Sequence, residues 1–229
     1  MKKLSKKLIA FALVLVMTVT AGAVIPQGMV EVQAASGRVY VNPYSDTVVT
    51  YKPEKKQNSF SGVISIMGCR KAKEIKNLKS SNKDIKVAPR DGYIRVEYGK
   101  KAAKSTITCT VKGVKLKTTF TVKKYSNPCK TFKIGKTNLT SKFNKIDVIG
   151  TNKAFKNQKL DVKLKDGWKI RSVHVTSGTG SYSDYNSINK SSFSKKITVS
   201  NNYGYIYVYC YNEKTKVSEC LQIVTSKRY

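Results

Sequence analysis

Residues 203–211 read Tyr-Gly-Tyr-Ile-Tyr-Val-Tyr-Cys-Tyr, an alternation of tyrosine with small or apolar residues. Successive side chains of a β-strand point to opposite faces of its sheet, so this alternation predicts a strand with one aromatic and one apolar face. The apolar face is expected to lie in a hydrophobic core. The aromatic face consists of Tyr203, Tyr205, Tyr207, Tyr209 and Tyr211.

The same period of two recurs along the chain, and turn-forming pairs such as Asp91-Gly92 and Asp166-Gly167 separate the segments. Further strands are expected at residues 63–66, 93–96, 106–112, 116–123, 160–164, 170–175, 197–199 and 217–224. Many short strands at regular spacing favour an all-β fold built from sandwiches. The one stretch with helical character, Leu8–Val16, lies close to the N-terminus.

An internal repeat divides the rest of the chain into two tandem β-sandwich domains. Shifting the sequence so that Ile107-Thr108-Cys109 aligns with Val208-Tyr209-Cys210 also aligns a second apolar set. That set is Leu116, Phe120 and Val122 against Val217, Leu221 and Ile223. Proline and asparagine break the strand pattern near Ser126-Asn127-Pro128. The predicted domains are therefore residues 35–125 and 126–229.

The first 34 residues carry the features of a cleaved signal peptide. A lysine-rich start precedes the apolar run Leu8–Val16, which is too short for a comfortable membrane span. Val32-Gln33-Ala34 offers small residues where a signal peptidase cuts, so the mature chain is expected to begin near Ala35. No cysteine follows the apolar run directly and no second long apolar stretch follows it. We therefore expect an exported protein without a transmembrane or lipid anchor.

The charge balance restricts the partners. Lysine and arginine number 44 against 13 acidic residues, which gives a formal net charge of +31. Such a field attracts polyanions such as cell-wall polymers, anionic headgroups and acidic glycans. Export, and lysines that greatly outnumber arginines, argue against specific nucleic-acid binding. The alternative is that the lysines only keep exposed strands soluble and protect sheet edges.

The first predicted domain resembles the bacterial immunoglobulin-like (Ig-like) domain of group 2. The resemblance rests on Asn77-Leu78-Lys79-Ser80-Ser81-Asn82, Gly92-Tyr93-Ile94 and Ser105-Thr106-Ile107-Thr108, with Ile85, Val87 and Gly99 between them. It spans about residues 40–124. Leu78 stands where the family usually has tryptophan, and Lys100–Lys104 lengthen the last motif. The resemblance implies an Ig-like sandwich that serves as a spacer, an adhesion module or a glycan-facing module, and it does not imply a catalyst.

Five cysteines in an exported chain suggest disulfides. Cys109 shares a face with Ile107 and Val111, and Cys69 closes an earlier strand, so Cys69–Cys109 is the first predicted bridge. Strand alternation places Cys129 and Cys220 outward, and Cys129–Cys220 is the second. Trp168 stands where a partner for Cys210 would be, which makes Cys210 the candidate free thiol. A Cys210–Cys220 bridge across the hairpin, which would need a bulge, and an absence of bridges remain open.

Catalysis and metal binding find little support in the residues. The single histidine, His174, lies between two valines on a predicted strand, which favours an exposed strand position over a general base. The acidic residues are scattered, and no zinc, calcium or phosphate-loop motif occurs. We therefore expect a non-enzyme that uses no metal or cofactor.

The predicted function is that of a secreted, monomeric surface module, structural or adhesive, which associates noncovalently with anionic cell-wall polymers or glycans. A host surface protein is a further candidate partner. Lysines such as Lys112, Lys115 and Lys117 would supply the attraction. The alternative is a carbohydrate-binding module in which the tyrosine strand stacks on sugars, extended by Tyr182 and Tyr185 from the loop at residues 178–187. Against a binding role of the tyrosine strand, neighbouring strands and lysines would simply cover the rings, and the loop would be a plain solvated connection.

Overall fold

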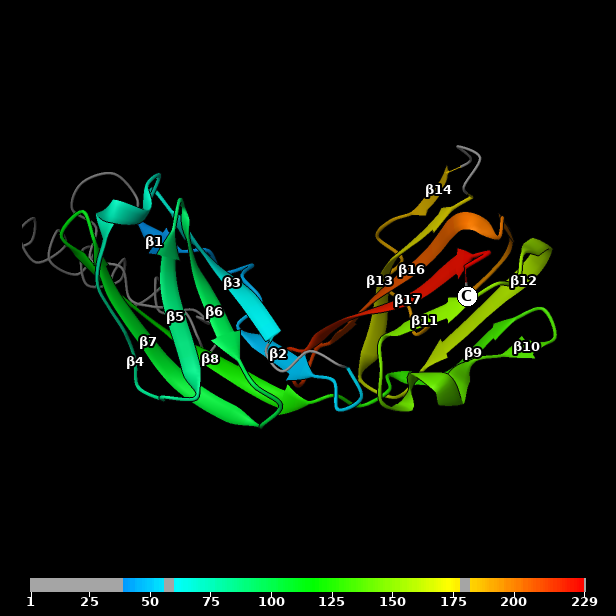
Figure 1. The fold of residues 1–229 in the computed structure, drawn as a ribbon, viewed down its shortest axis with the longest axis horizontal. Coiled ribbons are helices and arrows are strands. Elements are labelled where there is room, and N and C mark those ends of the chain that lie inside the picture. Colours follow the sequence, from blue (N-terminus) through cyan, green and yellow to red (C-terminus); the bar gives the residue numbers. More distant parts are fainter. Residues whose placement is uncertain (1–38, 56–59, 178–181, 229) are drawn as a thin grey trace, which may run out of the picture.

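The computed structural model describes residues 39–55, 60–177 and 182–228, which form two β-sandwiches joined end to end (Figure 1). The predicted all-β fold of tandem Ig-like sandwiches is confirmed, whereas the predicted signal peptide lies outside the described residues. Helical structure in these ranges is confined to two short 3₁₀ turns, η1 (Ala72–Glu74) and η2 (Thr140–Asn144). No helix of the described residues is long and apolar enough to cross a membrane.

The first sandwich has two four-stranded sheets, ordered β1-β3-β6-β5 and β2-β8-β7-β4. If β1 and β2 are the two halves of one interrupted first strand, this is the strand order of a constant-type immunoglobulin domain. All pairs are antiparallel except β2 with β8. The strands are β1 (Tyr40–Val41), β2 (Val48–Tyr51), β3 (Phe60–Met67), β4 (Ile75–Ser80), β5 (Ile85–Arg90), β6 (Tyr93–Tyr98), β7 (Ala103–Val111) and β8 (Val114–Lys124).

The second sandwich has sheets ordered β10-β9-β12-β15 and β11-β17-β16-β13-β14. Strand β11 runs parallel to β17, as β2 does to β8, so both sandwiches begin in the same way. The strands are β9 (Cys129–Ile134), β10 (Thr137–Asn138), β11 (Val148–Thr151), β12 (Phe155–Leu164), β13 (Trp168–Thr176), β14 (Tyr182–Tyr185), β15 (Ser192–Val199), β16 (Asn202–Asn212) and β17 (Ser218–Ser226).

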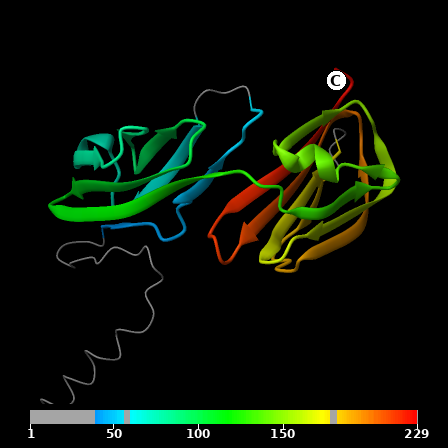
Figure 2. The same cartoon turned by 90° about the horizontal axis from the view of Figure 1, so that it is seen from below.

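Each sandwich has its own hydrophobic core. Phe120 is fully buried in the first core, where it packs against Tyr98, and its ring lies 3.0 Å from where a Cβ atom at Gly62 would be. In the second core, the rings of Phe132 and Phe143 pack with 4.9 Å between their centroids. The last strand of the first sandwich, β8, leads directly towards the second (Figure 2). Tyr125, one residue beyond β8, already belongs to the second core.

Tyr182 and Tyr185 were expected to lie in a loop and to extend the row of tyrosines, and for Tyr185 this expectation is wrong. Residues Tyr182–Tyr185 form β14, which extends the five-stranded sheet beside β13. Tyr185 lies opposite the buried Val173 in the strand register, and its ring packs against Phe193 with 5.0 Å between the ring centroids. It therefore faces the core and does not extend the row of tyrosines. The side chain of Tyr182 lies outside the described part of the chain.

The predicted Cys129–Cys220 bridge is not formed, for two structural reasons. Next to Leu164, β9 gains one residue relative to β12, and this bulge at Lys130 turns Cys129 into the core with 2% exposure. In addition, β9 and β17 belong to different sheets, and the neighbours of β17 are β11 and β16. Cys220 faces outward from β17 and is half-buried, so the sheet separates it from Cys129.

The other cysteines are also unbonded thiols. Cys69 and Cys109 both lie in the first core, but no bond joins them, and Cys210 is 1% exposed in the second core. Burial raises the pKa of Cys109 to about 11, of Cys129 to about 12 and of Cys220 to about 11. Because the thiolate is the reactive form, these thiols should be unreactive in the folded protein at neutral pH.

We therefore expect slow alkylation of the native protein at pH 8 and rapid titration of all five cysteines once the chain is denatured without reductant. A thiol-reactive chromophore followed by absorbance measures both. Fewer than five thiols in the denatured, unreduced protein would show that bridges form and would contradict the thiol assignment.

Candidate functional site

The predicted tyrosine strand is β16, at the centre of the five-stranded sheet between β13 and β17. Gly204, Ile206, Val208 and Cys210 point into the core, and the tyrosines point outward. Tyr203 is 48% and Tyr209 40% exposed, and the other three are half-buried. We call this surface, made of Tyr203, Tyr205, Tyr207, Tyr209 and Tyr211, the tyrosine face.

The rings of the tyrosine face stand beside one another along the strand. Tyr205 and Tyr207 are stacked with 9° between their planes and 5.8 Å between their centroids. The guanidinium of Arg171 lies 4.1 Å from the ring centre of Tyr211 and covers one of its faces. A sugar that stacks on an aromatic ring needs an open ring face. Where rings cover one another, this surface presents ring edges, which favours a sheet-stabilising ladder over a stacking platform.

A polar chain that the sequence did not predict lies beside the tyrosine face. Asp184 Oδ1 is 2.7 Å from His174 Nδ1, and His174 Nε2 is 3.0 Å from Ser172 Oγ. The edge of the imidazole also meets Tyr209, with 5.3 Å between the rings. His174 lies on the outer face of β13 as expected, but it is half-buried and held on both sides. One signal in the sequence could have indicated this contact: Ser172 lies two residues before His174, so both side chains are on the same face of the strand.

The hydrogen-bonded arrangement of Ser172, His174 and Asp184 is that of a catalytic triad, but the surrounding groups do not complete a hydrolase site. A triad also needs donors that stabilise an oxyanion. Here β13 lies between β16 and β14, so its backbone N–H groups serve the sheet. Among the described residues, no group of three His, Cys, Asp or Glu side chains could hold a metal ion. We assign the hydrogen-bonded series Ser172–His174–Asp184 a structural role, because it holds β14 against β13.

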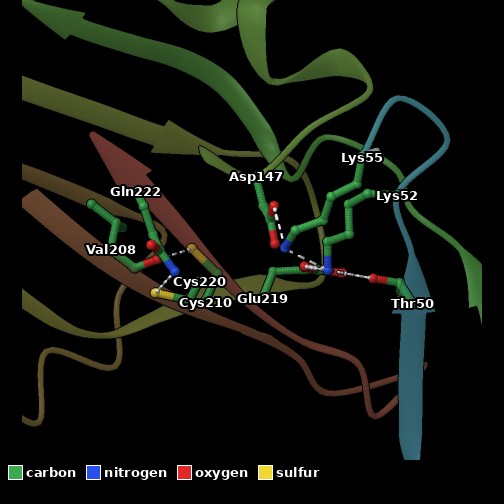
Figure 3. Close-up of polar contacts among 9 residues, drawn as sticks. All are labelled: Thr50, Lys52, Lys55, Asp147, Val208, Cys210, Glu219, Cys220 and Gln222. Carbon is green, nitrogen blue, oxygen red and sulfur yellow. Dashed lines mark hydrogen bonds and ion pairs between the residues drawn. The ribbon is translucent and has the colours of Figure 1, made fainter. Parts of the chain in front are cut away.

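The junction between the sandwiches contains a buried cluster of charges (Figure 3). Glu219 of β17, with 4% exposure, accepts a hydrogen bond from Thr50 of β2 and pairs with Lys52 Nζ at 2.8 Å. Lys52 also lies 3.3 Å from Asp147, which Lys55 approaches at 3.5 Å. The first sandwich supplies the cations and the second the anions, so the cluster joins the two domains.

Apolar and exposed contacts strengthen the same junction. Val48 of β2 packs against the second core, and the Lys52 ammonium lies 5.3 Å from the ring centre of Tyr125. At the rim, Lys145 pairs with Glu54 at 2.7 Å. Burying a charge is costly unless it is paired, so the cluster resists separation of the domains. These contacts hold the two sandwiches in one arrangement.

Burial raises the pKa of Glu219, an effect opposed by Lys52 and by the hydrogen bond from Thr50. The folded state therefore binds this proton more tightly than the unfolded state does. By linkage, the contribution of Glu219 to stability increases as the pH falls through the raised pKa, and it decreases as the pH rises. At neutral pH the cluster is thus held together in spite of the desolvation of Glu219.

A pocket of about 400 Å³ opens beside the cluster, and Lys52, Lys55 and Arg95 are among its lining residues. Carboxylates next to these three side chains already balance their positive charges. The lysines face Asp147 and Glu219, and Arg95 pairs with Glu97 at 3.1 Å. The pocket therefore has little net charge with which to attract an anion.

Unbalanced positive charge is found on the outer face of the sheet β2-β8-β7-β4. Lysines from β4 and β8 flank threonines of β7, and no acidic residue lies on these three strands. We call this surface the lysine–threonine face; it consists of Lys76, Lys79, Thr108, Thr110, Lys115 and Lys117. None of its lysines forms an ion pair with a residue that the structure describes. Lys112, also predicted to attract polyanions, instead contacts Glu74 and the carbonyl oxygen of Gly68.

No protein family matches the chain, and no curated protein does. Among solved structures, the fibronectin(III)-like modules of Clostridium thermocellum CbhA align over 83% of this chain and 96% of theirs, with 14% identity and a TM-score of 0.31. The BSP domain of a biofilm-associated protein aligns over 83% of this chain and 29% of its own, with 14% identity and a TM-score of 0.26. The D0-D1 domain of intimin aligns over 79% and 94%, with 7% identity and a TM-score of 0.25.

Proposed function

We propose that this chain is a secreted, non-catalytic Ig-like module that associates noncovalently with anionic polymers of the cell surface and has a structural or adhesive role. The observation that carries the proposal is the surplus of unpaired lysines. Nearly every described acidic residue already pairs with a basic side chain, and the exceptions are Asp46 and Asp161. Among the residues that the structure describes, the remaining lysines have no carboxylate to neutralise them, so an external polyanion is the partner that their charge favours.

Within this proposal, residues 40–124 are a group 2 Ig-like domain. The motif residues contact one another in a way that supports it. Ser80 Oγ lies 2.7 Å from Ser105 Oγ, and Thr106 donates its N–H to Ser81 Oγ at 2.9 Å. Asn82 donates to the carbonyl oxygen of Lys104 at 3.1 Å. These hydrogen bonds connect the end of β4 to the start of β7. Leu78, in the usual tryptophan position, packs against the first core.

The test is cosedimentation of the chain from residue 35 onward with purified Gram-positive cell walls, before and after the anionic polymers are stripped. We expect binding at low salt that weakens steeply as salt is added, because screening shortens the reach of exposed charges. Stripping should abolish it. Absence of binding to either wall would contradict the proposal. Salt-insensitive binding that Tyr209→Ala removes would instead favour the glycan-binding alternative through the tyrosine face.

A further inference from the structure

The lysines of the lysine–threonine face are brought into register by a bulge in β4. Lys76 pairs with Thr110, but Lys79, three positions later, pairs with Thr108, only two positions along β7. The extra residue is accommodated at Asn77, whose φ is +51°. An ideal strand would place Lys76 and Lys79 on opposite faces. The bulge places both outward, and both are exposed.

Strand pairing on the other side of β7 completes two parallel rows. Thr110 pairs with Lys115 and Thr108 pairs with Lys117, and all four side chains point outward. Each row thus has a lysine at either end and a threonine hydroxyl between them. Neighbouring strands lie about 4.8 Å apart and alternate residues of a strand about 6.8 Å apart, so the rows repeat at a fixed short spacing.

We propose that the lysine–threonine face binds a polyol-phosphate polymer, with successive phosphodiesters lying over successive lysine–threonine–lysine rows. This inference rests on the proposed function and names its site and ligand class. The face offers ammonium groups and hydroxyl donors but no arginine. Lysine binds phosphate as a point charge, and a hydroxyl between two ammonium groups can donate a hydrogen bond to a phosphate oxygen. No aromatic side chain lies on the face to stack a nucleobase, which favours a polyol phosphate over a nucleic acid.

The outward face of a sheet in the second sandwich supplies a matched control. On the sheet β10-β9-β12-β15, Lys133, Lys159, Lys163 and Lys196 are likewise exposed, but Asp161 lies among them, opposite Lys133 in the strand register. Removing four lysines from either face changes the net charge of the chain equally. A difference between the two variants therefore reports the site and not the total charge.

The experiment compares binding of purified poly(glycerol phosphate) to the wild type, to Lys76→Gln/Lys79→Gln/Lys115→Gln/Lys117→Gln and to Lys133→Gln/Lys159→Gln/Lys163→Gln/Lys196→Gln. By fluorescence anisotropy at low salt, we expect the first variant to lose affinity roughly a hundredfold and the second no more than about threefold. Thr108→Val/Thr110→Val, which keeps every charge, should lose roughly fivefold for this polymer because two hydroxyl donors are removed.

Three results would overturn the inference: equal losses in the two lysine variants, no effect of the threonine changes, or tighter binding of single-stranded DNA of equal charge than of poly(glycerol phosphate). Equal losses combined with wall binding would leave the proposed function standing with diffuse charge as its basis. Absence of wall binding by the wild type would instead remove the proposed function itself.

Discussion

Glu219→Ala is expected to lower the free energy of unfolding by about 3 kcal/mol or more, a large loss for a substitution outside the cores. Of the two described anionic partners of Lys52, the alanine leaves Asp147, and it leaves the Thr50 hydroxyl without its acceptor on Glu219. Because these groups come from both sandwiches, the domains should also separate more easily. Urea denaturation measures the stability, and small-angle X-ray scattering measures the spread of domain arrangements.

Two control variants make this prediction specific. Glu213→Ala removes an exposed pair with Lys169 and should cost less than about 1 kcal/mol. Glu219→Gln keeps an acceptor for Thr50 and should cost less than the alanine. Since the pKa of Glu219 is raised, lowering the pH should stabilise the wild type relative to Glu219→Gln. Equal losses in Glu213→Ala and Glu219→Ala would contradict the assignment of a buried cluster at the junction.

Phe120→Ala is expected to destabilise the first sandwich by about 3–5 kcal/mol, because a fully buried ring is replaced by a cavity beside Gly62 and Tyr98. The contacts of Phe120 belong to the first core alone. Differential scanning calorimetry should therefore show one transition shifted down by roughly 12 °C or more, while the transition of the second sandwich moves little.

The matched variant is Phe132→Ala, which removes an equally buried ring from the second core. It should lower the other transition and spare the one that Phe120→Ala affects. A single transition lowered to the same extent by both variants would contradict two separately packed domains and would indicate one cooperative unit.

The sequence predicted strands best where alternation is regular. The tyrosine strand appears as β16 with its tyrosines outward, and the aligned segments around Cys109 and Cys210 form β7 and β16, which occupy corresponding positions in the two sandwiches. The error at Cys129 arises at a bulge, because one extra residue at Lys130 reverses the facing of this side chain. A second bulge, at Asn77, places Lys76 and Lys79 on the same side, and the sequence analysis made no prediction there. A period-two pattern cannot locate such insertions, because the pairing that reveals them is non-local.

The charged junction was missed although one signal was present. Glu219 lies in phase with the buried Val217, Leu221 and Ile223, so an acidic residue occupies an inward position of a strand. A buried acid requires a cationic partner, but no pattern of residues distinguishes Lys52 from the many other lysines. The tyrosine face was located correctly as an outward surface, and its binding role stays a prediction. Its ring packing depends on neighbours such as Arg171 that only the fold brings into contact.

The most direct test of the account is a map of backbone amide chemical shifts as poly(glycerol phosphate) is titrated into isotopically labelled protein. We predict that the shifts concentrate on β4, β7 and β8, around Lys76, Thr108 and Lys117, and disappear at high salt. Shifts centred on the tyrosines of β16, or spread evenly over both sandwiches, would contradict a polymer site on the lysine–threonine face.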